Sequence, residues 1–499
     1  MVYDKISEEI SIITSLEDFR SVVTGLNGEA RVPIEVRTTV DDPYLAYQRV
    51  RSESDSVFLE TTGGQDGFGY FGTDPEYWVT NPNGEDGSFD QLEELLADER
   101  LVRGDCDVPY PCGAFGWLSY DIARELESIS DSTEDDRTLP RLQFGVYDLI
   151  ASWEEPRDDC ETEIRVTCCP TVSPNADVND VYASARKRLA DFVSQIHTGE
   201  RFTGEISSEA SVTFQNEVGK DEYVDRVQTV KQYIRDGDTF QANISQRLSA
   251  PAAVHPVDVF SALREVNPAP YSGLLEFPGV DLISTSPELL LECHRDRLVT
   301  EPIAGTRPRG DTPDEEQALE DELLNNEKEH AEHAMLVDLE RNDVGKVAEY
   351  GSVEVTDYRR IDRYSEVIHT VSVVEGTRRD DKSIADAIAA VFPGGTITGA
   401  PKPRTMDIID EVESTRRGPY TGSMGVIGFD ERATMNMTIR TLVNTSGKYY
   451  LRVGAGIVHD SDPVDEFYET IDKGQALINA VNDALGEDIE LEFEVEAGS

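Results

Sequence analysis

Apolar and polar residues alternate with two periods along this chain, one typical of strands and one typical of helices. In the first half, short apolar runs between Gly, Pro and acidic residues, such as Ser56–Glu60 and Cys112–Tyr120, predict strands joined by turns. Apolar residues at helical spacing predict a helix from about Val178 to Ile196, which should end near Gly199. The first half is therefore expected to contain many strands and a long helix at its end.

The polar segment 198–213 follows neither period and contains Ser and Gly, so it is the predicted linker. It would separate a domain at 15–197 from a second domain at 214–485. Beyond the linker, Lys220–Asp236 shows helical spacing and is followed by Gly237. Further strands are predicted at Thr239–Leu248, Gly273–Phe277, Leu282–Thr285, Gly351–Tyr358, Gly422–Phe429, Thr434–Val443 and Tyr449–Val453. Further helices are predicted at Pro313–Asp338, Ser383–Val391, Arg404–Glu411 and Pro463–Asn482.

Strands and helices are mixed, and several neighbouring strands are close enough in the chain to pair as hairpins. This mixture predicts an α+β fold with large antiparallel sheets.

Acidic residues exceed basic residues by a wide margin, with 99 Asp and Glu, 45 Lys and Arg, and a formal net charge of −54. Self-repulsion of this size strains a compact protein in dilute salt. At 1 M salt the Debye length falls to about 3 Å, and the repulsion is screened. We interpret the acid excess as adaptation to a salty cytoplasm. It argues against nucleic acid or an anionic membrane as a partner.

The first residues, 1–19, carry acids among apolar positions and no basic stretch, unlike a secretory signal. No apolar run approaches the roughly 20 residues of a membrane-spanning helix. We therefore expect a soluble, cytoplasmic protein.

The six cysteines form no C-x2-C pair, which predicts reduced thiols rather than disulfides or a zinc site. They are Cys106, Cys112, Cys160, Cys168, Cys169 and Cys293.

The segment Pro302–Gly310 places two arginines, Arg307 and Arg309, on either side of a proline that keeps the backbone extended. Guanidinium groups bind carboxylates with two hydrogen bonds, and glycine lets backbone N–H groups approach closely. Such a loop suits a small polyanion. The alternative is a surface loop with solvated arginines.

Two predicted helices each carry two glutamates three residues apart, Glu329 with Glu332 and Glu466 with Glu469. This spacing places both carboxylates of a pair on one helical face. Two such faces brought together would suit Mg²⁺, which takes a few protein carboxylates and keeps positions for water or substrate oxygens. In a chain this acidic, the same spacing also arises often by chance. The apolar and histidine neighbours of these pairs favour a site.

Glycine-rich and polar segments follow in the second half. Gly394–Lys402 departs from the P-loop pattern, because Ala and Pro precede Lys402 and no Ser or Thr follows it. It could still present backbone donors and the Lys402 ammonium to a carboxylate or hydroxyl. Gly454–Gly456 follows a predicted strand and would permit close approach. Tyr420, and Arg440 on a predicted strand, add polar side chains, although each alone is more often structural than functional.

Two further residues could exchange protons with a substrate. His369 lies in a mostly apolar strand-like run, where a single histidine is more often a core residue than a catalyst. Glu288 ends a predicted strand in Ser-Pro-Glu and would hold its proton more tightly if buried. A plain surface turn is the alternative for Glu288.

In this order, the segments resemble the chorismate-utilising enzymes and, among them, component I of the anthranilate synthases. The resemblance covers nearly the whole chain and is strongest from about Glu222 to Ala480. In the first half it rests on FLETTGG (58–64) and GAFGWLSYD (113–121). In the second half it rests on 237–247, 267–273, 284–290, 302–310, 327–347, 364–376, 392–404, 416–425, 439–441 and 454–470.

The resemblance implies a fold of large antiparallel sheets packed face to face with helices outside. It also implies a lyase that converts chorismate and ammonia to anthranilate and pyruvate in tryptophan biosynthesis. Mg²⁺ would be held by Glu332 and Glu469, with Glu329 and Glu466 beside them, and would bind the ring carboxylate of chorismate.

The same resemblance implies roles for further residues. Glu288 would protonate the departing C4 hydroxyl, ammonia would attack C2, and His369 would assist the later loss of the enolpyruvyl group as pyruvate. The implied substrate-binding residues are Gly305, Thr306, Lys402, Tyr420, Arg440, Gly454, Ala455 and Gly456.

Three positions distinguish the branches of the family. Members that add water carry a catalytic lysine where this chain has Gln241. Aminodeoxychorismate synthases usually carry a nucleophilic lysine where this chain has Ala304, and a serine near Thr396. These differences favour anthranilate, with Gln241 and Thr396 among the catalytic residues. The segment QANISQR (241–247) resembles aminodeoxychorismate synthases instead, so component I of such a synthase remains the alternative.

The chain shows no G-x-C-x-G pattern of a glutaminase nucleophile. The resemblance therefore implies a separate glutamine amidotransferase subunit that supplies ammonia in a hetero-oligomer, expected to be a heterotetramer. It also implies feedback inhibition by tryptophan, bound by Thr61, Pro270, Tyr271 and Ser272. Thr61 replaces the usual serine and Ser272 the usual methionine.

A non-catalytic relative or an acidic binding protein is the competing hypothesis. Such a protein would be expected to lose Glu332, Glu469, Arg440 or Thr306, and all four are present.

Overall fold

The computed structural model describes residues 10–62, 64–82, 84, 87–157, 161–202, 204, 213–310, 312–363 and 367–486. Residues 203 and 205–212 of the predicted linker, and Cys160, lie outside this range. The helices are α2 (Leu16–Thr24), α3 (Pro43–Val50), α4 (Ser88–Asp98), α5 (Ala123–Leu126), α6 (Val178–Thr198), α7 (Lys220–Asp236), α8 (Pro256–Val266), α9 (Pro313–Asn325), α10 (Glu327–Gly345), α11 (Ile384–Val391), α12 (Lys402–Val412) and α13 (Pro463–Leu485), with a 3₁₀ turn at Tyr120–Ile122.

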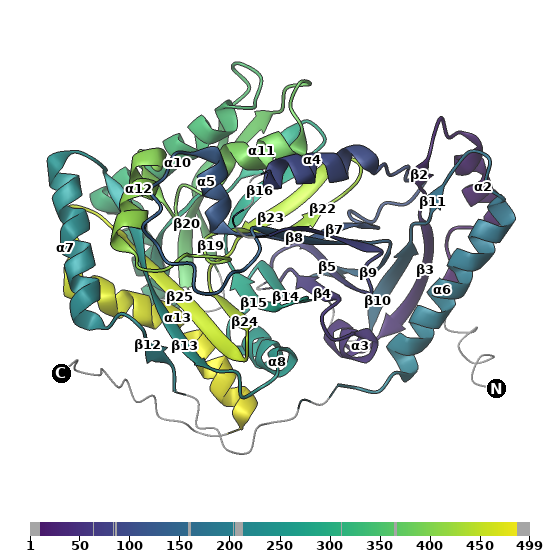
Figure 1. The fold of residues 1–499 in the computed structure, drawn as a ribbon, viewed down its shortest axis with the longest axis horizontal. Coiled ribbons are helices and arrows are strands. Elements are labelled where there is room, and N and C mark those ends of the chain that lie inside the picture. The colour runs from purple at the N-terminus through teal and green to yellow at the C-terminus, as the bar shows by residue number, and fades with distance from the viewer. Residues whose placement is uncertain are drawn as a thin grey trace.

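Two large antiparallel sheets form the framework (Figure 1). In spatial order, the first contains β1 (Ser11–Ile12), β3 (Ile34–Val40), β10 (Thr162–Cys168), β9 (Leu149–Glu155), β5 (Gly67–Thr73), β4 (Ser56–Glu60), β14 (Tyr271–Phe277), β15 (Val280–Ser286), β24 (Thr441–Thr445), β25 (Lys448–Ile457), β13 (Gln241–Pro251) and β12 (Gln215–Asn216), and β21 (Gly399–Ala400) also pairs with β13.

The second sheet contains β18 (Ile303–Pro308), β20 (Val367–Thr377), β17 (Arg297–Thr300), β16 (Leu289–His294), β23 (Arg432–Met437), β22 (Ser423–Ile427), β7 (Gly113–Leu118), β8 (Leu142–Tyr147) and β6 (Tyr77–Asn81). On the other side of β20 lies β19 (Glu354–Arg363). A separate ribbon joins β2 (Ala30–Arg31) to β11 (Thr171–Val172).

The sheets pack face to face, with helices on their outer sides. Buried Phe115 and Trp117 of the second sheet share one core cluster with Leu275 and Phe277 of the first. Other apolar clusters join the first sheet to α3, α6, α8 and α13, and the second sheet to α4, α10 and α11. Figure 1 shows α4, α10 and α11 on the opposite side of the sheets from α3, α8 and α13. The predicted fold class is confirmed.

Both sheets contain strands from before and after the predicted linker. In the first sheet β4 pairs with β14, through Phe58 and Leu274, and in the second β7 pairs with β22, through Trp117 and Met424. The two predicted domains therefore share their sheets, and their boundaries stay a prediction.

Several predicted elements are confirmed. Helix α7 has the predicted bounds and ends at Gly237, which takes a left-handed conformation with φ of 83°. Strand β4 also has the predicted bounds, and α6 extends to Thr198 with Gly199 as its C-cap.

Two predictions were wrong, because each predicted element is divided into two elements in the structure. The predicted helix Pro313–Asp338 is two helices, because Asn326 has an extended backbone and its side-chain oxygen accepts a hydrogen bond from the N–H of Glu329 (3.2 Å). The predicted strand Thr434–Val443 is two strands in different sheets. Arg440 lies between them with φ of 48°, not on a strand as expected, because the chain leaves the second sheet there and enters the first.

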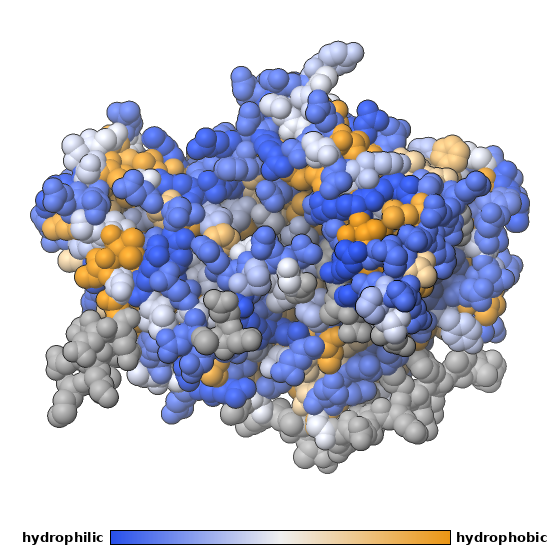
Figure 2. Space-filling model, turned by 180° about the vertical axis from the view of Figure 1, so that it is seen from behind, coloured by the Kyte–Doolittle hydropathy of each residue, from blue (hydrophilic) through white to orange (hydrophobic). Residues whose placement is uncertain are grey.

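The surface and the thiols agree with the composition. Figure 2 shows hydrophilic residues over most of the face seen from behind, with smaller hydrophobic patches among them. The five cysteines in the described part of the chain form no disulfide: Cys106, Cys112, Cys168, Cys169 and Cys293. Among the described helices, none is long and apolar enough to cross a membrane.

Candidate functional site

Two chain segments pass side by side from one sheet to the other. One connects β15 to β16 and carries Glu288, and the other connects β23 to β24 and carries Arg440. The Ser286 hydroxyl donates to the Met437 carbonyl (2.5 Å), and the Met437 N–H donates to the Glu288 carbonyl (2.9 Å). The N–H of Thr285 donates to the Arg440 carbonyl (3.2 Å). These hydrogen bonds place the predicted acid and the predicted substrate-binding arginine on adjacent segments between the sheets.

The Glu288 carboxyl is suited to donate a proton near neutral pH. The side chain is 5% exposed, and burial raises its pKa to about 8, with Glu340 adding to the effect. Hydrogen bonds from Thr396 and the Ile303 backbone, and the charge of Arg440, oppose this rise. Its Oε1 has no hydrogen-bond partner among the described residues. A protonated carboxyl with an unpartnered oxygen can act on a substrate hydroxyl.

His369 lies beside Thr306 where β18 and β20 pair. Nδ1 of His369 and the Thr306 hydroxyl are hydrogen-bonded at 2.9 Å. Burial lowers the pKa of His369 to about 4, helped by Arg440 and opposed by a backbone hydrogen bond with Gly305. The histidine is therefore neutral near pH 7 and can accept a proton.

Gly305 forms an irregularity in the pairing of β18 with β20, and its backbone is left-handed with φ of 77°. A Cβ there would lie 2.7 Å from Leu323 and 3.0 Å from Oε2 of Glu329. Only glycine fits this conformation and this space. One predicted metal-binding glutamate therefore lies against a predicted substrate-binding glycine.

The glycines of β25 lie under polar side chains from neighbouring segments. A Cβ on Gly454 would come within 2.6 Å of both Tyr420 Oη and Asn243 Oδ1. A Cβ on Gly456 would come within 2.7 Å of Gln241 Nε2. Residues two apart on a strand share a face, so Gln241 and Asn243 cover β25 together. Ala455, between the two glycines, is buried.

The glutamate pairs lie next to these binding segments. Glu329 is 3.3 Å from Nη1 of Arg307, and Glu469 is 2.7 Å from Nζ of Lys473, which also donates to the Gly454 carbonyl (3.2 Å). Glu332 and Glu466 each lie three residues away on α10 and α13, so they share a helical face with these two.

The donor chemistry of the four glutamates suits magnesium. Within the described residues, however, no three or more His, Cys, Asp or Glu side chains are grouped to hold a metal ion. Magnesium commonly uses one or two protein carboxylates and takes its other oxygens from water and substrate. Carboxylates suit such an ion chemically, and the magnesium site stays a prediction.

The remaining basic side chains of the predicted site are in ion pairs. Lys402 is buried, and its Nζ lies 2.5 Å from Asp343 and 3.0 Å from the Val391 carbonyl. Arg307 also lies 3.2 Å from Glu322, and Arg309 lies 2.9 Å from Glu316. Arg307 and Arg309, the arginines of the predicted polyanion loop, bind carboxylates of α9 and α10.

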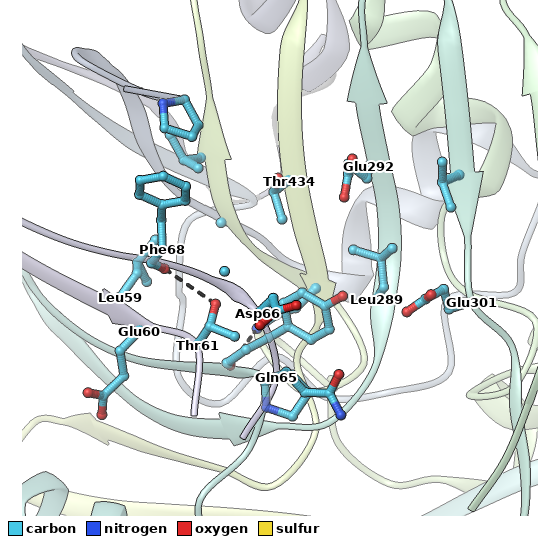
Figure 3. A pocket seen from close by; sticks show the side chains of 18 of the residues that line it. Leu59, Glu60, Thr61, Gln65, Asp66, Phe68, Leu289, Glu292, Glu301 and Thr434 are labelled. Carbon is cyan, nitrogen blue, oxygen red and sulfur yellow. Dashed lines mark hydrogen bonds between the residues drawn. The ribbon is translucent and has the colours of Figure 1, made fainter. Parts of the chain in front are cut away.

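Two cavities border this region. The smaller, of about 190 Å³, is lined by Arg440, Lys473, Pro287 and Pro270, among others. The larger, of about 500 Å³, lies between the sheets, and its lining includes Thr61, Pro270, Tyr271 and Ser272, the four residues predicted to bind tryptophan. Figure 3 shows Thr61 and Phe68 on one side of this cavity and Leu289 and Glu292 on the other. Pro270 lines both cavities.

Three residues of this region escaped the sequence analysis. Glu340 and Lys473 are among many charged residues on helices, and Asn243 lies in the motif QANISQR (241–247), in which only Gln241 was singled out. Only the spacing of Asn243 from Gln241, two residues on one strand, could have indicated a shared face.

Comparison with known proteins shows the family of this chain. A family model described as chorismate binding enzyme matches residues 42–479. The chain belongs to this family. Within it, a protein named anthranilate synthase component 1 1, from Haloarcula marismortui, is 61% identical over 97% of this chain and 99% of its own length. A protein named aminodeoxychorismate synthase component 1, from Bacillus subtilis, is 42% identical over 74% of this chain and 77% of its own length.

A solved structure of the same family has the same fold. The anthranilate synthase component I from Streptococcus pneumoniae superposes with a TM-score of 0.71 at 29% identity, covering 87% of this chain and 97% of its own.

Proposed function

We propose that this chain is component I of an anthranilate synthase and converts chorismate and ammonia to anthranilate and pyruvate. The observation that carries the proposal is the meeting of Glu288, Arg440 and His369 between the two sheets, in a chain 61% identical to an anthranilate synthase component. The buried acid, the cation and the neutral base provide the groups that this elimination needs.

The chain's own residues divide the reaction between them. Arg440 binds a carboxylate of chorismate, and Glu288 donates its proton to the C4 hydroxyl, which leaves as water. The ring double bonds shift as ammonia forms a bond at C2. His369 then accepts the proton of C2 as the C–O bond between the ring and the enolpyruvyl group breaks, which makes the ring aromatic. The released enolpyruvate takes up a proton and leaves as pyruvate. Glycines 454 and 456 leave room over β25 for the polar side chains of Tyr420, Asn243 and Gln241.

The proposal includes magnesium, held by Glu332 and Glu469 with Glu329 and Glu466 beside them. When bound, the ion would neutralise the ring carboxylate of chorismate. The position of Glu329 against Gly305, and the link from Glu469 through Lys473 to Gly454, support this assignment.

Ammonia would come from a glutamine amidotransferase subunit in a hetero-oligomer. The name component 1, carried by the relatives, supports a partner component.

We also propose that tryptophan binds in the 500 Å³ cavity and inhibits the enzyme. Pro270 borders this cavity and the one lined by Arg440, so a shift of the segment that carries it would reach the substrate site.

The alternative product is 4-amino-4-deoxychorismate. The segment QANISQR (241–247) and the 42% identical aminodeoxychorismate synthase favour it, and the higher identity to anthranilate synthases opposes it.

Incubation of the purified chain with chorismate, MgCl₂ and ammonium in molar salt decides between the two. Fluorescent anthranilate with an equal amount of pyruvate is the expected outcome. A non-aromatic amine without pyruvate would assign the chain to the other branch, and isochorismate would contradict both.

A further inference from the structure

Glu340 is a buried carboxyl on α10 that the proposed reaction does not use. It is 1% exposed, and its Oε1 accepts a hydrogen bond from the N–H of Gly395 (3.3 Å). A Cβ on Gly395 would lie 2.5 Å from Leu339 and 3.3 Å from the same oxygen, so only glycine lets the loop approach α10 this closely. The other oxygen, Oε2, has no hydrogen-bond partner in the described part of the chain.

The loop that Glu340 binds leads directly to the catalytic acid. Gly395 precedes Thr396, which lies close enough to the Glu288 carboxyl to lower its pKa, while the Thr396 hydroxyl donates to Met437 Sδ (3.4 Å). The Thr398 hydroxyl closes the same loop by donating to the Gly394 carbonyl (2.8 Å). Movement of Gly395 away from α10 would therefore displace Thr396 from Glu288.

Glu340 also acts on Glu288 through its charge. Its own pKa is raised to about 7 by burial and by Asp343, and Lys402 and the Gly395 N–H oppose the rise. The Lys402 ammonium is paired with Asp343, which also lies 2.8 Å from Lys346. When it is ionised, Glu340 disfavours ionisation of Glu288.

We propose that Glu340 is a positioning residue for the acid Glu288: it fixes the loop that carries Thr396, and its negative charge keeps the Glu288 carboxyl protonated. This inference rests on the proposed role of Glu288 as the proton donor. The groups that face Glu288 are Thr396, Glu340, the Ile303 backbone and Arg440. Of these, Glu340 alone carries a charge that opposes loss of the proton.

The test is the pH dependence of kcat for Glu340→Gln in the full-length protein. Glutamine keeps the acceptor for Gly395 but not the charge, so Glu288 should lose its proton more readily. We expect the alkaline limb of the profile to move to lower pH, with little change in KM for chorismate. Asp338→Asn is the matched control, because Asp338 lies on the same helix with 79% of its side chain exposed. An unchanged profile for Glu340→Gln would overturn the proposal.

A second pair of variants separates charge from position. Glu340→Asp keeps the charge but shortens the reach to Gly395, so kcat should fall while the alkaline limb stays in place. Combined with Thr396→Val, it should lower kcat by less than the product of the two single effects, because both act through one contact. If the double variant loses kcat by the full product of the two single effects, the loop contact is contradicted. This test does not depend on whether Glu340→Gln folds. The product assay on the unaltered chain tests the proposed function separately.

Discussion

Nδ1 of His369 lies 2.9 Å from the hydroxyl of Thr306, across the pairing of β20 with β18. The bond orients the imidazole ring beside Gly305. It joins a residue predicted to act on the substrate to one predicted to bind it. Arg440 lies close enough to lower the pKa of the same histidine.

His369→Gln should lower kcat by about 10²-fold or more, because it removes a general base without a large change in volume. Thr306→Val should lower kcat less, since the base remains but loses its orientation. Steady-state kinetics with chorismate and ammonium measures both. Equal kcat values for His369→Gln and the parent chain would remove the histidine from the mechanism.

Activity should fall as the pH rises through about 8, the pKa to which burial raises Glu288. The sign follows from the role: the acid works only while protonated, and it loses its proton above its pKa. Glu288→Gln should lower kcat by about 10²-fold or more and abolish this alkaline limb. A pH–rate profile at saturating chorismate shows it, and an alkaline limb that persists in the variant would belong to another group.

Glu469→Gln should abolish magnesium-dependent turnover while leaving the fold intact. Loss of one carboxylate weakens binding of a hard cation that has few protein ligands. Titration of the protein with Mg²⁺ by calorimetry measures this without turnover. Asp483→Asn is the control, because Asp483 is an exposed acid on the same helix, α13. Unaltered magnesium binding by Glu469→Gln would contradict the metal assignment.

Tryptophan should raise the melting temperature of the protein and inhibit it. A ligand that binds only the folded state stabilises it by about 2.7 kcal/mol at 100 times its Kd. Combined Thr61→Ala and Ser272→Ala substitutions should raise the tryptophan concentration needed for half inhibition. The exposed Thr229→Ala serves as control. Inhibition at the same concentration in all three proteins would place tryptophan elsewhere.

Dialysis from molar salt to about 0.1 M should unfold or inactivate the protein. The Debye length then lengthens to about 10 Å, and the charges behind the net −54 repel one another over that distance. Far-UV circular dichroism and turnover, recorded at each salt concentration, follow the transition. Full activity in dilute salt would show that the acid excess has another cause.

Local patterns in the sequence were enough to predict most helices and strands and several chemical groups. Helix α7 ends at Gly237 because glycine accepts the left-handed conformation that ends it, and this signal lies within the segment itself. The resemblance of the motifs likewise indicated the family, and the roles of Glu288 and His369 that it implies stay predictions. Such features depend on residues that are close together in the chain.

Other features depend on residues that are far apart, and only the tertiary structure decided them. The apolar pattern of Thr434–Val443 is continuous, yet Arg440 turns the chain into the other sheet because β23 and β24 find partners in different sheets. The sequence does not distinguish Glu340 among the 99 acidic residues, and only folding buries it against Gly395. Burial and distant neighbours set the pKa of a carboxyl and join Thr61 to Ser272 in one cavity, and no local pattern contains that information.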